Sequence, residues 1–192
     1  LTISPTFYLA SNGVTVKCSG CSAGDTGMVG GVLYTAHDNT SIAAKNKNDN
    51  DWNRIVTTLV TDMSDLFKNQ NSFNQNISSW DTSNVTTMHG MFDNARAFNQ
   101  NIGSWDTSSV TDMSEMFKGD PNAWSNFQNG GSNSIGNWDV SSVTDMSDMF
   151  YGKQRFNVNI GSWDVSNVTN MRGMFAFSEF NQNIGSWDVS NV

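Results

Sequence analysis

Five aspartates that each follow a tryptophan are the side chains whose spacing could most readily support chemistry. They are Asp81, Asp106, Asp139, Asp164 and Asp188. On adjacent strands such carboxylates are expected to form an outward-pointing ladder, about 4.8 Å apart, and would repel one another unless they were compensated. Calcium could compensate them, because it binds carboxylate oxygens. The serine two residues after each aspartate offers a local alternative, a hydrogen-bonded turn that stabilises the ionised form. Since the Gly-x-Asp nonapeptide of calcium-binding repeats is absent, we favour the turn and keep calcium as the alternative.

Two cysteines, Cys18 and Cys21, could form a disulfide or contribute to a metal site. A zinc site would need two more ligands, and His37 and His89 lie far away without ligand spacing. A redox-active pair would need a βαβ context, which the surrounding Gly-, Ser- and Thr-rich sequence does not offer. We therefore expect a small structural disulfide, as in proteins from an oxidising compartment.

No further group of residues resembles a catalytic site or a site for nucleic acid. The histidines lie outside nucleophile and metal motifs, and there is no phosphate-binding glycine loop. A net charge of −8 with only ten Lys and Arg disfavours nucleic acid and anionic lipid surfaces. No apolar run approaches the roughly 18 residues of a transmembrane helix. We expect a non-enzymatic chain without a cofactor or a transmembrane segment.

The elements that would position these residues follow from an internal repeat that begins near residue 55. Trp-Asp recurs at intervals of 25, 33, 25 and 24 residues, together with Met-x-x-Met-Phe and Phe-Asn-x-Asn. One unit alone has too few apolar residues to form a core, so stacking of neighbouring units is expected to bury them in rows. The predicted tryptophan row consists of Trp80, Trp105, Trp138, Trp163 and Trp187. The ten methionines are expected to fill gaps in the same core.

Local spacing then predicts the backbone of each unit. Trp163 and Val165 lie two apart, which is typical of a short strand. Met113, Met116 and Phe117 fall at i, i+3 and i+4, which is typical of a short helix. A strand and a helix repeating every 25 residues predict an α/β fold, a leucine-rich-repeat-like solenoid with its usual period of about 20–29 residues.

The phrases Trp-Asp-Val-Ser-Asn-Val-Thr at 163–169, Thr-Asp-Met-Ser-Glu-Met-Phe at 111–117 and Phe-Asn-Gln-Asn-Ile at 180–184 closely resemble the BspA-like, DUF285 type of repeat. The resemblance covers residues 55–192. It implies a secreted or surface-anchored protein that binds a partner, and it leaves the ligand open. Residues 1–54 resemble the region that often precedes such repeats, and their alternating segments predict a β-rich element that caps the first repeat.

One unit contains eight extra residues within 118–134. Insertions in repeat proteins form loops on one face, often the binding face. Trp124 and Phe127 in this insertion are therefore candidate exposed contact residues, and a loop whose aromatic residues fold back on the core is the alternative. The candidate N-glycosylation sites are Asn39, Asn76, Asn84 and Asn167.

Two functions remain open at this point. The chain could serve adhesion or recognition of a protein or glycan on a cell surface, in an extracellular setting. It could instead be a structural building block that packs against copies of itself in a surface filament, sheet or wall layer. The chain starts at Leu1, so either a signal peptide has been removed or the sequence is a fragment. Because it stops within a repeat, we expect a fragment with further repeats beyond Val192.

Overall fold

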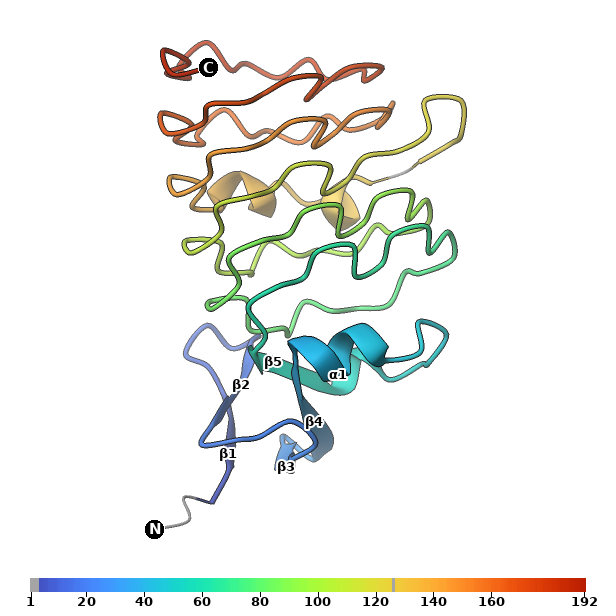
Figure 1. Ribbon diagram of the computed structural model, residues 1–192, viewed down its shortest axis with the longest axis vertical. Helices are drawn as coiled ribbons and strands as arrows, with labels where there is room; N and C mark the ends of the chain where they lie inside the picture. Colours follow the sequence, from blue (N-terminus) through green and yellow to red (C-terminus); the bar gives the residue numbers. More distant parts are fainter. Residues whose placement is uncertain (1–3, 126) are drawn as a thin grey trace.

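All the strands in the described part of the chain lie before residue 60. The computed structural model describes residues 4–125 and 127–192. An antiparallel pair is formed by β1 (Thr6–Leu9) and β2 (Val16–Ser19), and a second sheet has the order β3 (Thr26–Val29), β4 (Val32–Asp38), β5 (Ile55–Leu59). Strands β3 and β4 are antiparallel, and β4 and β5 are parallel (Figure 1).

Between β4 and β5 lie α1 (Asn39–Ala44) and the 3-10 helix η1 (Trp52–Arg54). Asp38 and Ser41 form a capping box, in which each side chain accepts a hydrogen bond from the backbone N–H of the other residue, so α1 begins directly where β4 ends. Ile42 is buried in the main core. The crossover therefore joins the small sheet to the rest of the molecule.

Residues after β5 form turn-rich layers that lie on top of one another (Figure 1). Two 3-10 helices, η2 (Asn129–Gly131) and η3 (Ser134–Asn137), are the only named elements described in this part. Single-residue parallel bridges connect successive layers through Asp62, Thr87, Asp112, Asp145 and Asn170. Each layer thus pairs with the next at one residue in this column, and no strand develops there among the described residues.

The predicted fold class is wrong. We expected an α/β, leucine-rich-repeat-like solenoid with a short strand and a short helix in every unit, whereas the described residues contain one α-helix and two small sheets, all before residue 60. The backbone explains the missing helices, because one residue between the two methionine positions always has positive φ. These residues are Asp65 (54°), Gly90 (58°), Glu115 (55°), Asp148 (53°) and Gly173 (65°). An α-helix needs φ near −63°, so this residue ends the helical turn.

Hydrogen bonds between layers replace the bonds of a helix. The backbone N–H groups of Gly90, Phe92 and Asn94 donate to carbonyls of the next layer at 2.8–2.9 Å. The predicted strand at Trp-Asp is absent as well: Trp105 and Asp106 form no regular element, and the N–H of Trp105 donates to the carbonyl of Ile102, which closes the turn before them. The i, i+3, i+4 spacing of Met113, Met116 and Phe117 therefore identifies side chains that point into the same core, although the backbone that carries them is a turn.

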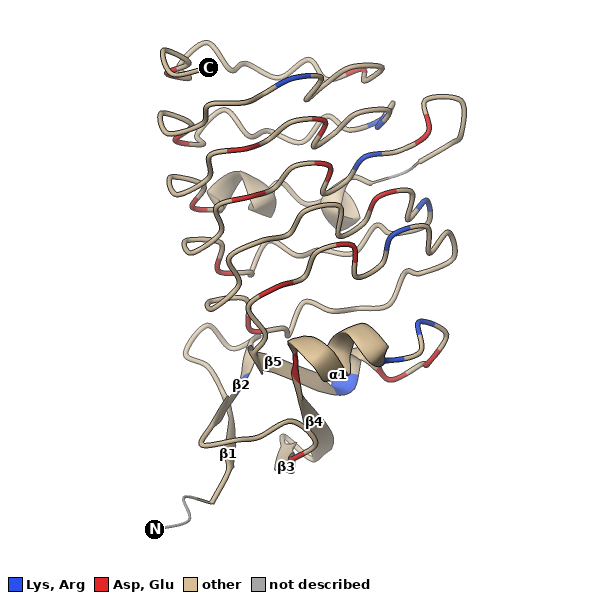
Figure 2. Cartoon of the chain, in the orientation of Figure 1, with Lys and Arg blue, Asp and Glu red and all other residues tan. Residues whose placement is uncertain are grey.

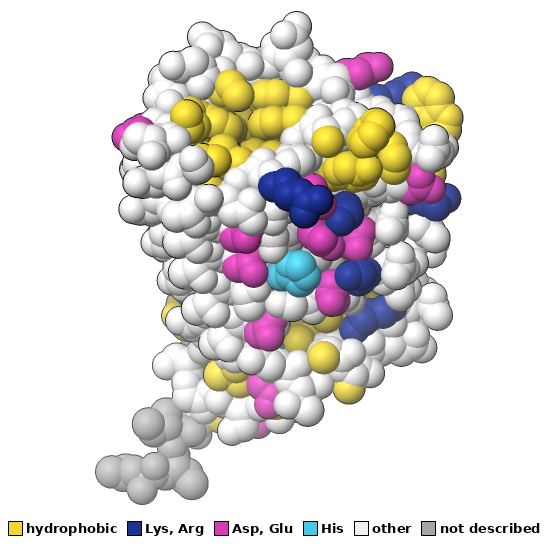
Figure 3. Space-filling view, turned by 45° about the horizontal axis from the view of Figure 1, so that its top comes forward, with side chains coloured by type: hydrophobic (Ala, Val, Ile, Leu, Met, Phe, Trp, Pro, Cys, Tyr) yellow, Lys and Arg dark blue, Asp and Glu magenta, His cyan; other side chains and the backbone are white. Residues whose placement is uncertain are grey.

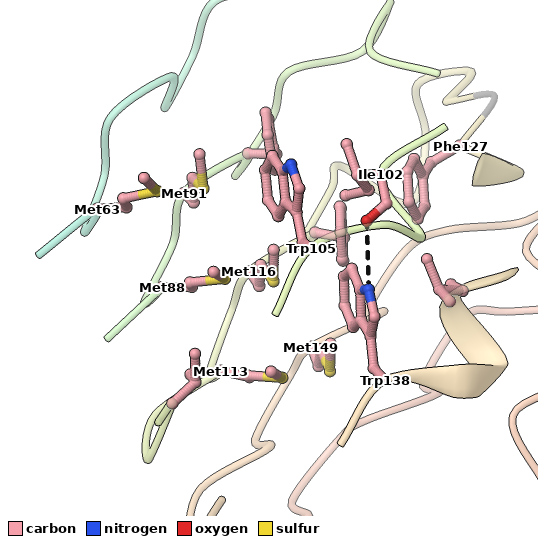
Figure 4. Close-up of a cluster of buried hydrophobic side chains, with 14 of the residues drawn as sticks. Met63, Met88, Met91, Ile102, Trp105, Met113, Met116, Phe127, Trp138 and Met149 are labelled. Atoms are coloured by element: carbon pink, nitrogen blue, oxygen red, sulfur yellow. Dashed lines mark hydrogen bonds between the residues drawn. The ribbon is translucent and has the colours of Figure 1, made fainter. Parts of the chain in front are cut away.

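The main core consists of parallel rows of aromatic, methionine and aliphatic side chains. Rings of Trp80, Trp105, Trp138 and Trp163 stack with centroids 6.1–6.5 Å apart and planes within 7° of parallel. Trp187 is partly buried and packs against this core. The indole N–H groups of these four stacked tryptophans each donate to a backbone carbonyl. That of Trp138 donates to the carbonyl of Ile102 at 3.3 Å, as the dashed line in Figure 4 shows.

The predicted boundary between residues 54 and 55 falls within continuous structure. Strand β5, the first element of the predicted repeat region, pairs with β4 of the predicted cap. Trp52 is fully buried in the same core as Trp80. A second, small core contains Val16, Cys18, Ala36 and Val56. Among the described residues there is no helix of the length and apolarity needed to cross a bilayer.

Candidate functional site

The insertion places one of its two candidate contact residues inside the molecule. Exposure and folding back on the core were both open for Phe127, and the structure shows it folded back: it is 2% exposed and its ring lies between those of Phe98 and Phe156, at 6.0 and 6.2 Å. Its position in the chain explains the result, because the eight extra residues are divided into four before Phe127 and four after it. Phe127 is therefore the regular phenylalanine of its unit. The insertion range 118–134 includes residue 126, which lies outside the described residues.

Trp124, by contrast, lies on the surface and is 73% exposed. The guanidinium carbon of Arg155 lies 4.8 Å from the centre of the indole, which is cation–π geometry. Two side-chain amides attach the insertion to the neighbouring layer, since Gln154 donates to the carbonyl of Pro121 and Gln128 donates to the carbonyl of Arg155. Trp124 is thus held in place over residues 154–155.

A second exposed ring, Phe177, belongs to the layer that follows residues 154–155 and was not predicted from the sequence. It is 63% exposed and packs edge-to-face against Tyr151 at 5.2 Å. Its φ of 56° is rare for a bulky residue. The equivalent residues in other layers with positive φ are of types that tolerate this backbone, namely Asn69, Asn94 and Gly152. A phenylalanine in a column of Asn and Gly is the signal that could have identified it.

Trp124 and Phe177 line one open depression, which we call the aromatic depression. Its volume is about 480 Å³. It is lined by Pro121, Trp124, Gln154, Arg155, Phe177, Ser178 and Glu179. Figure 3 shows exposed apolar side chains close to charged groups of both signs near the C-terminal end of the molecule. The aromatic depression thus combines two exposed rings with an amide, a hydroxyl, a cation and a carboxylate.

A buried lysine lies beneath the insertion. Lys153 is 2% exposed, and its ammonium donates to the hydroxyl of the buried Ser125 at 2.7 Å. Burial lowers the pKa of Lys153 to about 8, while the charge of Asp93 opposes this change and that of Arg96 adds to it. Burial raises the pKa of Asp93, whose Oδ1 has no hydrogen-bond partner among the described residues. This lysine attaches the segment that holds Trp124 to the next layer.

The aspartates after tryptophan do not form one uniform column. Figure 2 shows acidic residues at matching places on successive layers. Asp106, Asp139, Asp164 and Asp188 are exposed, and each accepts a backbone hydrogen bond from the serine two residues later. Hydrogen bonds from Ser141, Ser166 and Ser190 lower the pKa of Asp139, Asp164 and Asp188 respectively. These contacts are those of the local turn.

Asp81 was expected to point outward with the others, and this is wrong. It is 2% exposed because the N-terminal sheets cover it. Lys17 of β2 lies 3.1 Å from one carboxylate oxygen, and the Thr58 hydroxyl of β5 donates to the other at 2.7 Å. Burial raises the pKa of Asp81, but hydrogen bonds from Ser83, Thr58 and Lys17 outweigh burial, so the pKa is lowered. Asp81 therefore joins the N-terminal sheets to the first layer.

The remaining candidates have local roles. Cys18 and Cys21 form a disulfide, with their Cα atoms 6.0 Å apart. His89 shares a hydrogen bond with the hydroxyl of Ser114, which donates to Asp112, so this hydroxyl is already committed to a carboxylate. Within 4–125 and 127–192, no group of three or more His, Cys, Asp or Glu side chains is placed to hold a metal ion. These contacts are structural, and they give calcium no additional support.

The four glycosylation candidates are exposed and differ in what their amides do. The amide nitrogens of Asn84 and Asn167 donate to the preceding layer at 2.8 Å, and that of Asn39 donates to the Thr61 hydroxyl at 2.9 Å. Asn76 uses its amide oxygen, which accepts a hydrogen bond from the N–H of Ser78 at 3.0 Å. Asn76 is therefore the site at which a glycan would disturb the fewest of the observed contacts.

Comparison with known proteins identifies the family and assigns no activity. A family model described as "Mycoplasma protein of unknown function, DUF285" matches residues 35–129 and 121–192. No curated protein and no solved structure matches the chain. The two matches together span most of the sequence and confirm the DUF285 part of the resemblance. The chain belongs to the DUF285 family.

Proposed function

We propose that this chain is a non-enzymatic recognition module of an extracellular or cell-surface protein, and that the aromatic depression is its contact surface. The observation on which this depends is the pair of exposed rings, Trp124 and Phe177, at one depression. Exposed aromatic rings beside polar groups are typical of binding surfaces, because such rings contribute large contact area. The other Trp and Phe side chains of the layers mostly lie in the buried rows.

Three further features support the proposal. The attachment of the insertion through Gln154 and Lys153 pre-organises Trp124, so that less ordering is needed when a partner binds. The Cys18–Cys21 disulfide is consistent with an oxidising compartment. The resemblance to BspA-like repeats, which occur largely in surface proteins, supports the same setting.

The proposal can be tested with a panel of immobilised oligosaccharides, proline-rich peptides and extracellular proteins. We expect the wild-type chain to bind a component of the panel and Trp124→Ala to lose that binding. Met28→Ala is a matched control, because Met28 is 60% exposed on β3, away from the insertion. If Trp124→Ala binds every component as well as the wild type does, or if the wild type binds none, the depression is not a recognition site.

Self-assembly is the second candidate function, and one observation favours it. Met28 and Leu33 are cross-strand partners in the β3–β4 hairpin and are 60% and 53% exposed. Exposed apolar pairs promote contacts between molecules. If the chain is a building block, sedimentation velocity should show concentration-dependent association that the double substitution of Met28 and Leu33 by Lys abolishes. A monomer at all concentrations would contradict this alternative.

A further inference from the structure

We infer that the ligand of the aromatic depression is a carbohydrate, with one sugar ring stacked on Trp124 and its hydroxyls bound by the polar side chains around it. This inference rests on the proposed recognition function and names the class of ligand.

The indole of Trp124 is presented as a flat, fixed surface. Arg155 lies over one side of the ring, and Trp124 is nevertheless 73% exposed. The face of an aromatic ring is electron-rich, so it attracts groups with a partial positive charge. The C–H groups on one face of a pyranose have this character, and they are arranged in a nearly flat surface of similar size. A fixed indole is therefore suited to a sugar ring.

The polar groups of the depression match hydroxyls that both donate and accept hydrogen bonds. Arg155 supplies donors, the Glu179 carboxylate supplies acceptors, and the amide of Gln154 and the hydroxyl of Ser178 can do both. The cation and the carboxylate give the depression no strong net charge. The volume of about 480 Å³ lies within the range of about 300–1,000 Å³ that is typical of small-molecule sites. A neutral saccharide fits this combination.

Peptide ligands fit less well. Addition of a strand needs a free sheet edge, and all described strands end by Leu59, outside the lining of the depression. Phosphopeptides require clusters of arginine, and Arg155 is the one arginine in the lining. A polyproline segment could pack on the two rings, but proline has no backbone N–H to donate to Glu179. A sugar hydroxyl can supply that hydrogen bond.

Phe177 provides independent support. Its φ of 56° is the conformation that Asn69, Asn94 and Gly152 adopt at equivalent positions. A phenylalanine there opposes the preference of the backbone, and Phe177 is 63% exposed, so burial offers it little compensation. A contact with a ligand would account for both features, because strained residues concentrate at sites of binding.

The test compares the wild-type chain with three variants on a panel of neutral and acidic oligosaccharides, proline-rich peptides and extracellular proteins, followed by calorimetry with the best-bound component. Trp124→Ala removes the stacking surface, Phe177→Asn removes the second ring while suiting the backbone, and Met28→Ala is the control. We expect Trp124→Ala to weaken saccharide binding at least about tenfold, as loss of stacking on an aromatic ring does in other complexes. Phe177→Asn should weaken it severalfold, and the control should not change it.

Because Trp124 is exposed and Asn occupies the Phe177 position in other layers, both variants should fold, which circular dichroism and thermal melting would verify. If the wild type binds saccharides and Trp124→Ala binds them equally well, the inference is overturned. If only proline-rich peptides or proteins bind in a Trp124-dependent way, the ligand class is wrong and the recognition function stands. If no component binds, both the ligand class and the recognition function fail.

Discussion

Substitution of Lys153 by methionine should stabilise the protein at neutral pH. The pKa of this lysine is lowered from 10.5 to about 8 by burial, so the folded state disfavours the charged amine that is present at pH 7. At about 1.4 kcal/mol per pH unit, this corresponds to about 3 kcal/mol of destabilisation. Methionine has a similar length, fills the same space and needs no proton.

Part of this gain is lost because Ser125, which is 4% exposed, would lose its hydrogen bond to Lys153. An unpaired buried hydroxyl costs about 1 kcal/mol. The expected net increase in the free energy of unfolding is therefore about 2 kcal/mol, which corresponds to a rise in melting temperature of roughly 4–8 °C for a chain of this size.

The pH dependence gives the sharper test. The folded state binds fewer protons than the unfolded state between pH 8 and pH 10.5, so the stability of the wild type should rise across this window by about 3 kcal/mol. The advantage of Lys153→Met, about 2 kcal/mol at pH 7, should shrink from pH 8 upward, disappear near about pH 9.5 and reverse to a deficit of about 1 kcal/mol by about pH 10.5. Urea unfolding at a series of pH values measures the difference directly.

Lys118→Met is the matched control, because Lys118 forms ion pairs with Glu115 and Asp148 that raise its pKa despite partial burial. This control should lower stability at pH 7. An advantage of Lys153→Met that stays constant from pH 7 to pH 10.5, or a loss of stability at pH 7, would refute the reasoning about burial of the charged amine.

Three further predictions concern other contacts. Lys17→Met should lower the free energy of unfolding by about 2 kcal/mol near pH 7, because Asp81 would lose a charged partner while staying buried. Since the pKa of Asp81 is lowered, the stabilisation by the Lys17–Asp81 pair is present above about pH 4 and lost in acid. Equal losses of stability at pH 3 and pH 7 in urea unfolding would contradict this prediction. Phe177→Asn should raise stability by about 1 kcal/mol, because asparagine tolerates the positive φ at this position better than phenylalanine does. An unchanged or lower melting temperature would show that the backbone is not strained. Addition of EDTA should leave the melting temperature unchanged, because serines satisfy the exposed aspartates, and a fall of many degrees would favour bound calcium.

Much of the core could be predicted from spacing, whereas the backbone could not. Side chains such as Trp105 and Met113 recur at fixed intervals, and the structure buries them because equivalent residues of successive layers lie over one another. The same spacing fits a helix or a turn. The positive φ at Glu115 decides in favour of the turn. In the sequence, only the glycines at the equivalent positions 90 and 173 indicate a positive φ there.

The candidate site was harder to predict because it depends on contacts between layers. Trp124 and Phe177 come from different layers, and the pattern within one repeat says nothing about their proximity. Phe127 was hard to place because four extra residues separate it from Phe117 and four more from Ile135, so neither neighbouring motif keeps its usual distance from it. The burial of Asp81 depends on the N-terminal sheets, which lie outside the repeat.

The division of the insertion by Phe127 has a consequence for how proteins of this type can change. The inner phenylalanine row continues from Phe98 to Phe156 although the chain is four residues longer on each side of Phe127. Phe127 thus anchors the loop to the core, and the chain length on either side of this anchor is independent of the interior packing. Foreign peptides grafted before or after the anchor should be displayed without rebuilding the scaffold, and related chains could acquire new specificities by the same route.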